Sequence, residues 1–119
     1  MIKEAYCSFE VAKLLKEKGF NERSSASYDS EGQLQEGRAY WNTTPILYSA
    51  PTHQMAMSWL REEYNIIIVL KPATFSGDNC TAWTYELWCG DNFEGEMRSF
   101  KTYEEAVEAA LKYSLKNLI

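Results

Sequence analysis

The stretch THQMAMSWLREEYNIIIVL, residues 52–70, joins an amphipathic helix directly to an apolar strand. Thr52 can cap the first free amides of the helix. The apolar side chains at helical spacing share one side of it: Ala56, Trp59, Leu60 and Tyr64. From residue 66 to residue 70 every side chain is apolar and most are β-branched, which is typical of a strand covered on both faces. We therefore expect this helix and strand to form the centre of the core.

Two weaker elements are expected before residue 51. Ser8 is a suitable cap for a helix over residues 9–18, which Gly19 would end by adopting a left-handed conformation. The turn-forming residues 29–32, Asp-Ser-Glu-Gly, predict a polar β-hairpin between the flanking segments 24–28 and 33–41. The sequence does not indicate whether this hairpin joins the main sheet.

The C-terminal half predicts strands followed by a helix. Residues 73–80 are expected to form a loop, because Pro72 would end the preceding strand. Side chains then alternate between two faces over residues 83–89, which predicts a strand, and residues 96–100 would return antiparallel to it. Thr102 and Glu105 have capping-box spacing and predict the start of the last helix.

Together these elements predict an α+β fold, a single two-layer domain that spans residues 1–119. The predicted order is helix, β-hairpin, helix, three-stranded antiparallel meander, helix. The N-terminal helix and hairpin would occupy residues 1–50, and an α-β-β-β-α core would occupy residues 51–119. A chain of 119 residues is long enough to fold as one domain with its own core.

The charge of the chain disfavours nucleic acid and anionic lipid as general partners. The formal net charge is −5 and the isoelectric point is about 4.9, whereas affinity for polyanions grows with local positive charge. A nucleic-acid-binding module remains the alternative hypothesis. Its basic cluster would consist of four residues near the first helix: Lys13, Lys16, Lys18 and Arg23.

The sequence predicts a cytoplasmic protein with no membrane contact. Residues 1–10 contain no apolar run of the secretory type, and no apolar span reaches the length of a membrane helix. The cysteines are odd in number and widely spaced, at Cys7, Cys80 and Cys89, which fits reduced thiols better than a disulfide framework.

No pattern in the sequence predicts catalysis, a metal or another cofactor. His53 is the only histidine, and its position in the first turn of a helix is an ordinary exposed one. With the three cysteines it would give the ligand count of a zinc site, but the short spacing between ligands is missing. Paired carboxylates such as Glu62-Glu63 are typical of solvated faces and helix starts. No phosphate-binding loop or dinucleotide motif occurs. We expect the protein not to be an enzyme.

The tryptophans give the best indication of a binding surface. The alternating strand would place Trp83 on one face and Trp88 on the other, so that burial of both is difficult. Exposed tryptophan is enriched at protein contacts. Trp41 and Trp88 are therefore the candidate protein-binding residues, unless the hairpin covers the second face of the sheet.

Three pieces of the chain carry a resemblance to a known family. They are SFEVAKLLKEKGF (residues 8–20), YSAPTHQMAMSWLREEYNIII (48–68) and FKTYEEAVEAALKYSLKNLI (100–119), a little under half of the chain. In these pieces the chain resembles a family of small uncharacterised proteins from gut Bacteroidales and their phages and mobile elements. Met55 departs from the polar or acidic residue that this family usually has there. The resemblance implies a setting and no activity.

A second resemblance is topological, because residues 52–118 run α-β-β-β-α as in a double-stranded RNA-binding domain. Such domains bind phosphates with lysines at the start of the last helix, where this chain has Tyr103-Glu104-Glu105. The leading hypothesis is therefore a non-enzymatic accessory protein of a phage or mobile element. It would act by binding an unidentified protein partner or a second copy of itself.

Overall fold

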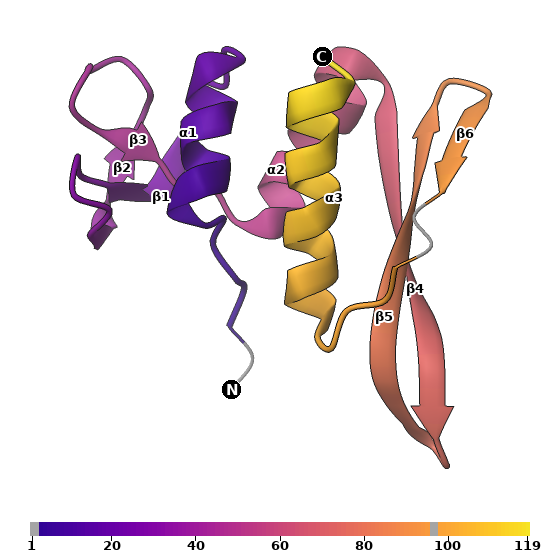
Figure 1. The fold of residues 1–119 in the computed structure, drawn as a ribbon. Helices are drawn as coiled ribbons and strands as arrows, with labels where there is room; N and C mark the ends of the chain where they lie inside the picture. The colour runs from indigo at the N-terminus through magenta and orange to yellow at the C-terminus, as the bar shows by residue number, and fades with distance from the viewer. Residues whose placement is uncertain (1–2, 96–97) are drawn as a thin grey trace.

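Three helices lie between two antiparallel sheets in the computed structural model, which describes residues 3–95 and 98–119 (Figure 1). The helices are α1 (Phe9–Glu17), α2 (His53–Tyr64) and α3 (Tyr103–Asn117). One sheet has the order β2-β1-β3 and consists of β1 (Ser24–Tyr28), β2 (Leu34–Tyr40) and β3 (Tyr48–Ser49). The other has the order β4-β5-β6 and consists of β4 (Ile66–Ser76), β5 (Asn79–Cys89) and β6 (Asn92–Gly95). The predicted α+β class and the antiparallel meander are confirmed.

Each helix begins at the cap that the sequence predicts. The side chains of Ser8, Thr52 and Thr102 accept hydrogen bonds from backbone amides three residues further on. At the other end of α2, Asn65 adopts a left-handed conformation with φ 56°, which lets the chain turn directly into β4. Within the described residues, no helix combines the length and the apolar character needed to cross a membrane.

The core lies mainly among the helices and on the side of the second sheet that faces them. Phe20 and Trp59 pack edge to face with ring centroids 5.3 Å apart, beside a group of fully buried side chains from all three helices: Leu15, Leu60, Leu111 and Leu115. Ala110 of α3 packs against Tyr85 and Leu87 of β5. The helical layer therefore covers one face of the β4-β5-β6 sheet.

The prediction that residues 66–70 are covered on both faces is wrong. Burial alternates along this part of β4, with Ile66 buried at 2% exposure and Ile67 exposed at 39%. The predicted N-terminal hairpin does form, as β1 and β2, but it pairs with β3 in the separate sheet beside α1 (Figure 1). It therefore does not cover the second face of β4.

The predicted loop at residues 73–80 is also wrong. β4 continues to Ser76 and β5 begins at Asn79, so the two strands form one long hairpin arm. Pro72 is tolerated within β4 because this strand lies at the edge of the sheet, with a register irregularity just after it. The strand that returns antiparallel to β5 is β6, which lies earlier in the chain than the predicted segment 96–100. Of that segment, residues 96–97 lie outside the described part, and Phe100 forms an isolated β-bridge with Trp83.

Candidate functional site

One face of the β4-β5-β6 sheet is turned away from the helices and carries Trp88. We call this surface the open face, and it consists of Ile67, Val69, Lys71, Thr84, Glu86, Trp88 and Phe93. Cross-strand pairing places Trp88 between Ile67 and Phe93, and the Trp88 and Phe93 rings lie 4.8 Å apart. Phe93 is 53% exposed, and Val69 is also exposed. The open face therefore presents a continuous apolar strip to solvent.

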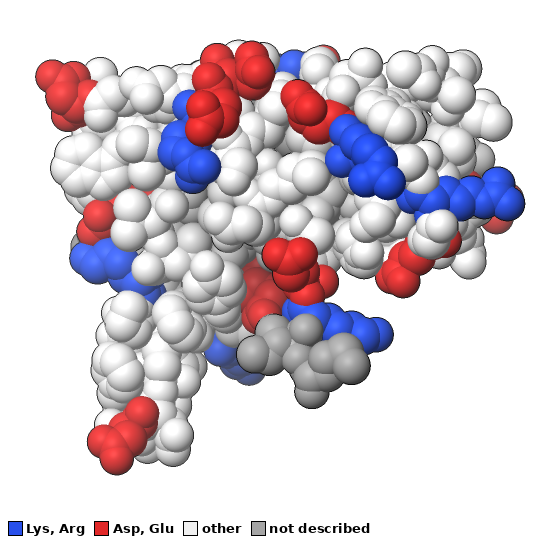
Figure 2. All heavy atoms as spheres, turned by 180° about the vertical axis from the view of Figure 1, so that it is seen from behind, with Lys and Arg blue, Asp and Glu red and all other residues white. Residues whose placement is uncertain are grey.

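The open face carries one pair of opposite charges, and the adjoining hairpin carries one more charged residue. Lys71 and Glu86 form an ion pair of 2.7 Å on the open face, and the Trp88 indole donates a hydrogen bond to the same carboxylate. The far half of the β4–β5 hairpin projects beyond the helices as an arm, which bears no charged side chain except Asp78 at its tip (Figures 1 and 2). Phe75 of this arm is 58% exposed.

The two candidate tryptophans do not lie on one surface. Trp41 directly follows β2 and is 45% exposed. Trp88 lies on β5, and the helical layer separates the two sheets (Figure 1). A single partner contact centred on either tryptophan would therefore leave out the other.

The four basic residues of the alternative hypothesis are largely occupied with their own chain. Lys16 donates hydrogen bonds to the carbonyls of Thr44 and Leu47 and lies over the Tyr48 ring. The ammonium of Lys18 donates to the Ile119 carbonyl, and that of Lys13 lies 4.8 Å from the centroid of the Phe9 ring. Arg23 is exposed just before β1. Phosphate binding by this group would thus compete with existing contacts.

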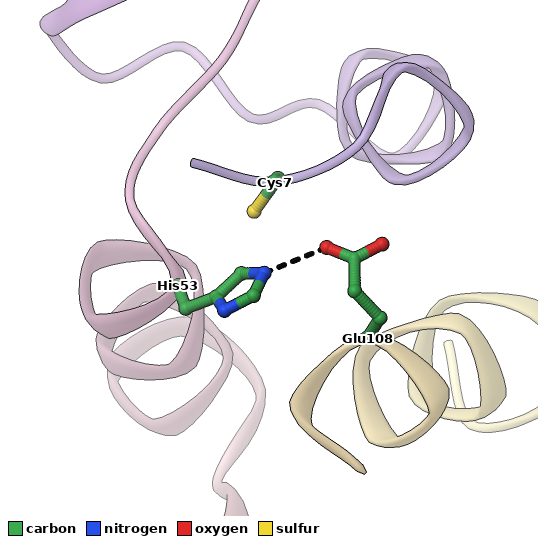
Figure 3. Close-up of side chains that lie close together, drawn as sticks. All are labelled: Cys7, His53 and Glu108. Carbon is green, nitrogen blue, oxygen red and sulfur yellow. Dashed lines mark hydrogen bonds and ion pairs between the residues drawn. The ribbon is translucent and has the colours of Figure 1, made fainter. Parts of the chain in front are cut away.

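The structure also brings together three side chains that are far apart in the sequence. Cys7, His53 and Glu108 converge where the segment before α1, the first turn of α2 and the middle of α3 meet (Figure 3). The Nε2 atom of His53 lies 2.7 Å from Oε2 of Glu108, and the three possible ligand atoms all lie within 4.8 Å of one another. We call this group the Cys-His-Glu centre.

Backbone pairing holds the centre in place. The Cys7 amide donates to the Pro51 carbonyl and the His53 amide donates to the Ala5 carbonyl, each at 2.9 Å. These bonds align the segment before α1 with the segment before α2. The Tyr28 hydroxyl donates to the Cys7 carbonyl at 2.6 Å, and the amide of Ser8 donates to Oε2 of Glu108 at 3.1 Å. The centre therefore ties α3 and β1 to both segments.

The surroundings shift the proton affinities of two of these groups in opposite directions. Burial raises the pKa of the Cys7 thiol well above its ordinary value, and the nearby Glu108 carboxylate adds to this effect. Burial would also raise the pKa of Glu108, but hydrogen bonds from His53 and Ser8 outweigh burial and hold this pKa below its ordinary value. Glu108 is thus ionised at neutral pH, and Nε2 of His53 donates to it.

This arrangement does not fit a cysteine nucleophile activated by histidine. Nucleophilic attack needs a thiolate, whereas Cys7 is fully buried and its pKa is raised. His53 presents Nε2 to Glu108, and its other ring nitrogen points away from Cys7 (Figure 3). A sulfur, an imidazole nitrogen and a carboxylate oxygen that face one point are instead a set of ligands for a borderline-soft metal ion.

An open cleft of about 950 Å³ lies next to the centre. His53 and Glu108 contribute to its wall together with Tyr6, Ser8, Lys112 and Tyr113, whereas Cys7 lies behind the wall. Two members of the centre are therefore within reach of solvent through the cleft.

Glu108 is not among the residues that the sequence predicts for a site, and His53 is expected from the sequence to be exposed. The expectation that His53 is exposed is wrong, since it is 6% exposed and hydrogen-bonded. Glu108 lies three residues before Leu111 and seven before Leu115, so helical spacing puts it in line with buried residues. A carboxylate in that position is the signal that could have identified it. Cys80 and Cys89, the other thiols of the hypothetical zinc site, lie on β5 and are not part of the centre.

Comparison of the chain with protein-family models, with curated proteins and with solved structures found no match in any of the three.

Proposed function

We propose that this chain is a non-enzymatic protein-binding protein that acts through the open face, and that the occupant of this face is a second copy of the chain. The observation that carries the proposal is the contact between the Trp88 and Phe93 rings, which are tilted at 54° to one another, beside exposed Ile67 and Val69. Large aromatic side chains in an apolar setting dominate the energetics of protein contacts. A sheet face of this kind packs well against another sheet face at a spacing of about 10 Å.

The charge distribution favours a second copy over a partner of high charge. The chain carries a net charge of −5, yet on the open face Lys71 and Glu86 cancel one another. The open face therefore has no electrostatic potential complementary to that of a strongly basic or acidic partner. A second copy offers the same apolar strip and the same balanced pair, so the contact itself brings no unpaired like charges together.

The size of the surface predicts a weak and reversible dimer. The eleven residues of β4 span roughly 36 Å, and strands about 4.8 Å apart give a width of roughly 10–14 Å. The projected area is then roughly 400 Å² per copy, below the area of about 800 Å² per partner in a standard stable interface. We therefore expect a dissociation constant in the micromolar range or weaker.

Sedimentation velocity over protein concentrations from low micromolar to near millimolar tests this proposal. We expect the wild-type chain to pass from monomer to dimer. Trp88→Ala should weaken dimer formation at least about tenfold, equivalent to about 1.4 kcal/mol, because it removes the largest side chain of the strip. Trp41→Ala is the matched control and should dimerise like wild type, since Trp41 is the same residue type and is exposed but lies off the open face. Circular dichroism checks that both variants are folded.

Three other outcomes would overturn parts of the proposal. A wild-type chain that stays monomeric near millimolar concentration rules out the second copy. A different protein that binds the monomer and is lost with Trp88→Ala would keep the open face but replace its occupant. Binding to nucleic acid that falls steeply with salt and is lost with Lys13→Ala and Lys18→Ala would instead support the alternative hypothesis.

A further inference from the structure

We propose that Cys7, His53 and Glu108 bind one zinc ion, which joins the segments before α1 and α2 to the middle of α3. The site is independent of the open face, because its ligands lie in the helical layer and in the segment before α1 (Figure 3). Each residue supplies a different donor: a thiolate sulfur, an imidazole nitrogen and a carboxylate oxygen. Zinc accepts all three donor types, whereas magnesium and calcium prefer oxygen alone.

The geometry needs only side-chain adjustments to fit a tetrahedral ion. With Zn–N and Zn–O near 2.0–2.1 Å and Zn–S near 2.3 Å, the ligand atoms would lie about 3.3–3.6 Å apart. The present separation of 2.7 Å between His53 Nε2 and Glu108 Oε2 would have to increase by about 0.6 Å. Other ligand separations are at most 4.8 Å and would have to shorten by no more than about 1.5 Å. Rotation of side chains can supply movements of this size.

Hydrogen bonds around the centre support its proposed role as a zinc site. The Tyr28 hydroxyl donates a hydrogen bond to the Cys7 backbone carbonyl, and the Ser8 amide donates one to the Glu108 carboxylate. Two of the three ligand residues are therefore already oriented. Such outer contacts are typical of metal sites, where they fix the direction of the ligands. The cleft that reaches His53 and Glu108 gives the ion a path of entry and leaves space for water as the fourth ligand.

Binding of the ion requires protons to move. The thiol of Cys7 loses its proton to the buffer, and the resulting thiolate binds the metal. The proton that Nε2 of His53 donates to Glu108 leaves this nitrogen for solvent, and the bound imidazole carries its proton on the other ring nitrogen, so that Nε2 can bind the metal. Zinc affinity should therefore rise with pH, since protons compete with the metal for Cys7.

Cobalt(II) spectroscopy tests the site, because a thiolate bound to cobalt gives a sulfur-to-metal charge-transfer band in the near ultraviolet. The chelator-treated chain is titrated with cobalt(II) and then with zinc. We expect a band that saturates at one equivalent and disappears when zinc displaces cobalt. The double variant Cys80→Ser/Cys89→Ser should keep the band, since Cys7 is then the only thiol left in the chain.

Variants of the ligands complete the test. Cys7→Ser should lose the band, and Glu108→Gln should bind cobalt at least about tenfold more weakly than wild type. The double variant keeps the test decisive even if Cys7→Ser fails to fold. Absence of the band from the double variant when the wild-type chain shows it would assign the metal to Cys80 or Cys89. Absence from both would show that the centre binds no such metal.

Discussion

Ile66 and Ile67 are adjacent, chemically identical and part of the same strand, yet one is buried at 2% exposure and the other is exposed at 39%. The same contrast recurs on β5, where Leu87 is buried under α3 and Trp88 lies on the open face. The strand itself is apolar on both sides. The difference therefore arises from what packs on each side, which is the helical layer on one and solvent on the other.

This comparison shows that an apolar strand face can have two roles in a chain of this size. On the covered face, side chains such as Ile66 join the main core and stabilise the monomer. On the open face, side chains of similar apolar character contribute little to the monomer and remain available for contact with another molecule. Substitutions that separate stability from association can therefore distinguish the two faces.

Truncation of the two isoleucines gives the largest expected effect. Ile66→Ala should lower the free energy of unfolding by about 2–5 kcal/mol, because it leaves a cavity in the core. Ile67→Ala removes the same atoms from the open face and should cost less than about 1 kcal/mol. Urea unfolding of both variants measures the difference. Equal losses would show that the open face is covered in solution.

Two carboxylate contacts in the described part of the chain, each 2.7 Å long, extend the comparison to polar groups. The two carboxylates are similarly exposed, Glu108 at 20% and Glu86 at 23%, but the partner side chain is 8% exposed for His53 and 51% exposed for Lys71. Glu108→Gln should cost about 1–3 kcal/mol, because it removes a charged acceptor from a sheltered site. Glu86→Gln should cost less than about 1 kcal/mol, since solvent reaches the Lys71 ammonium and screens the pair. A larger loss for Glu86→Gln would contradict this order.

The pH dependence of stability should identify Glu108 independently. Its pKa in the folded chain is below the ordinary value of 4.5, so the unfolded chain binds a proton more readily there. The stability that Glu108 contributes is present above pH 4.5 and is lost as the pH falls through its folded pKa. The titratable side chains that it faces include Cys7, His53 and Tyr28. Urea unfolding in chelator should therefore give a flatter acid limb for Glu108→Gln than for wild type.

Local signals in the sequence were sufficient for most of the elements. Caps at Ser8, Thr52 and Thr102, the turn before Gly32 and the alternation along β5 are confirmed, because each depends on neighbouring residues. The long-range arrangement was not predictable in this way. It depends on which distant segments pack together. Such packing decides whether the N-terminal hairpin covers β4, and whether Pro72 ends a strand or lies within an edge strand.

The Cys-His-Glu centre could not be predicted from the sequence for the same reason. His53 and Glu108 are 55 residues apart, and Cys7 joins them only because the segment before α1 pairs with the segment before α2. A search for short ligand spacing therefore could not find the centre. The placement of Trp88 on an open face follows the predicted alternation of β5, while its role in binding stays a prediction.

Val69→Thr on the open face should have only a small effect on stability. Threonine keeps the shape and strand preference of valine but adds a hydroxyl, which solvent can satisfy at this exposed position, so the unfolding free energy should change by less than about 0.5 kcal/mol. The same change at buried Val107 should cost about 1–3 kcal/mol, because its hydroxyl enters the core. Sedimentation velocity should nevertheless show weaker dimerisation for Val69→Thr, since two copies would bury that hydroxyl against an apolar strip. Unchanged dimerisation would place the contact between copies elsewhere on the surface.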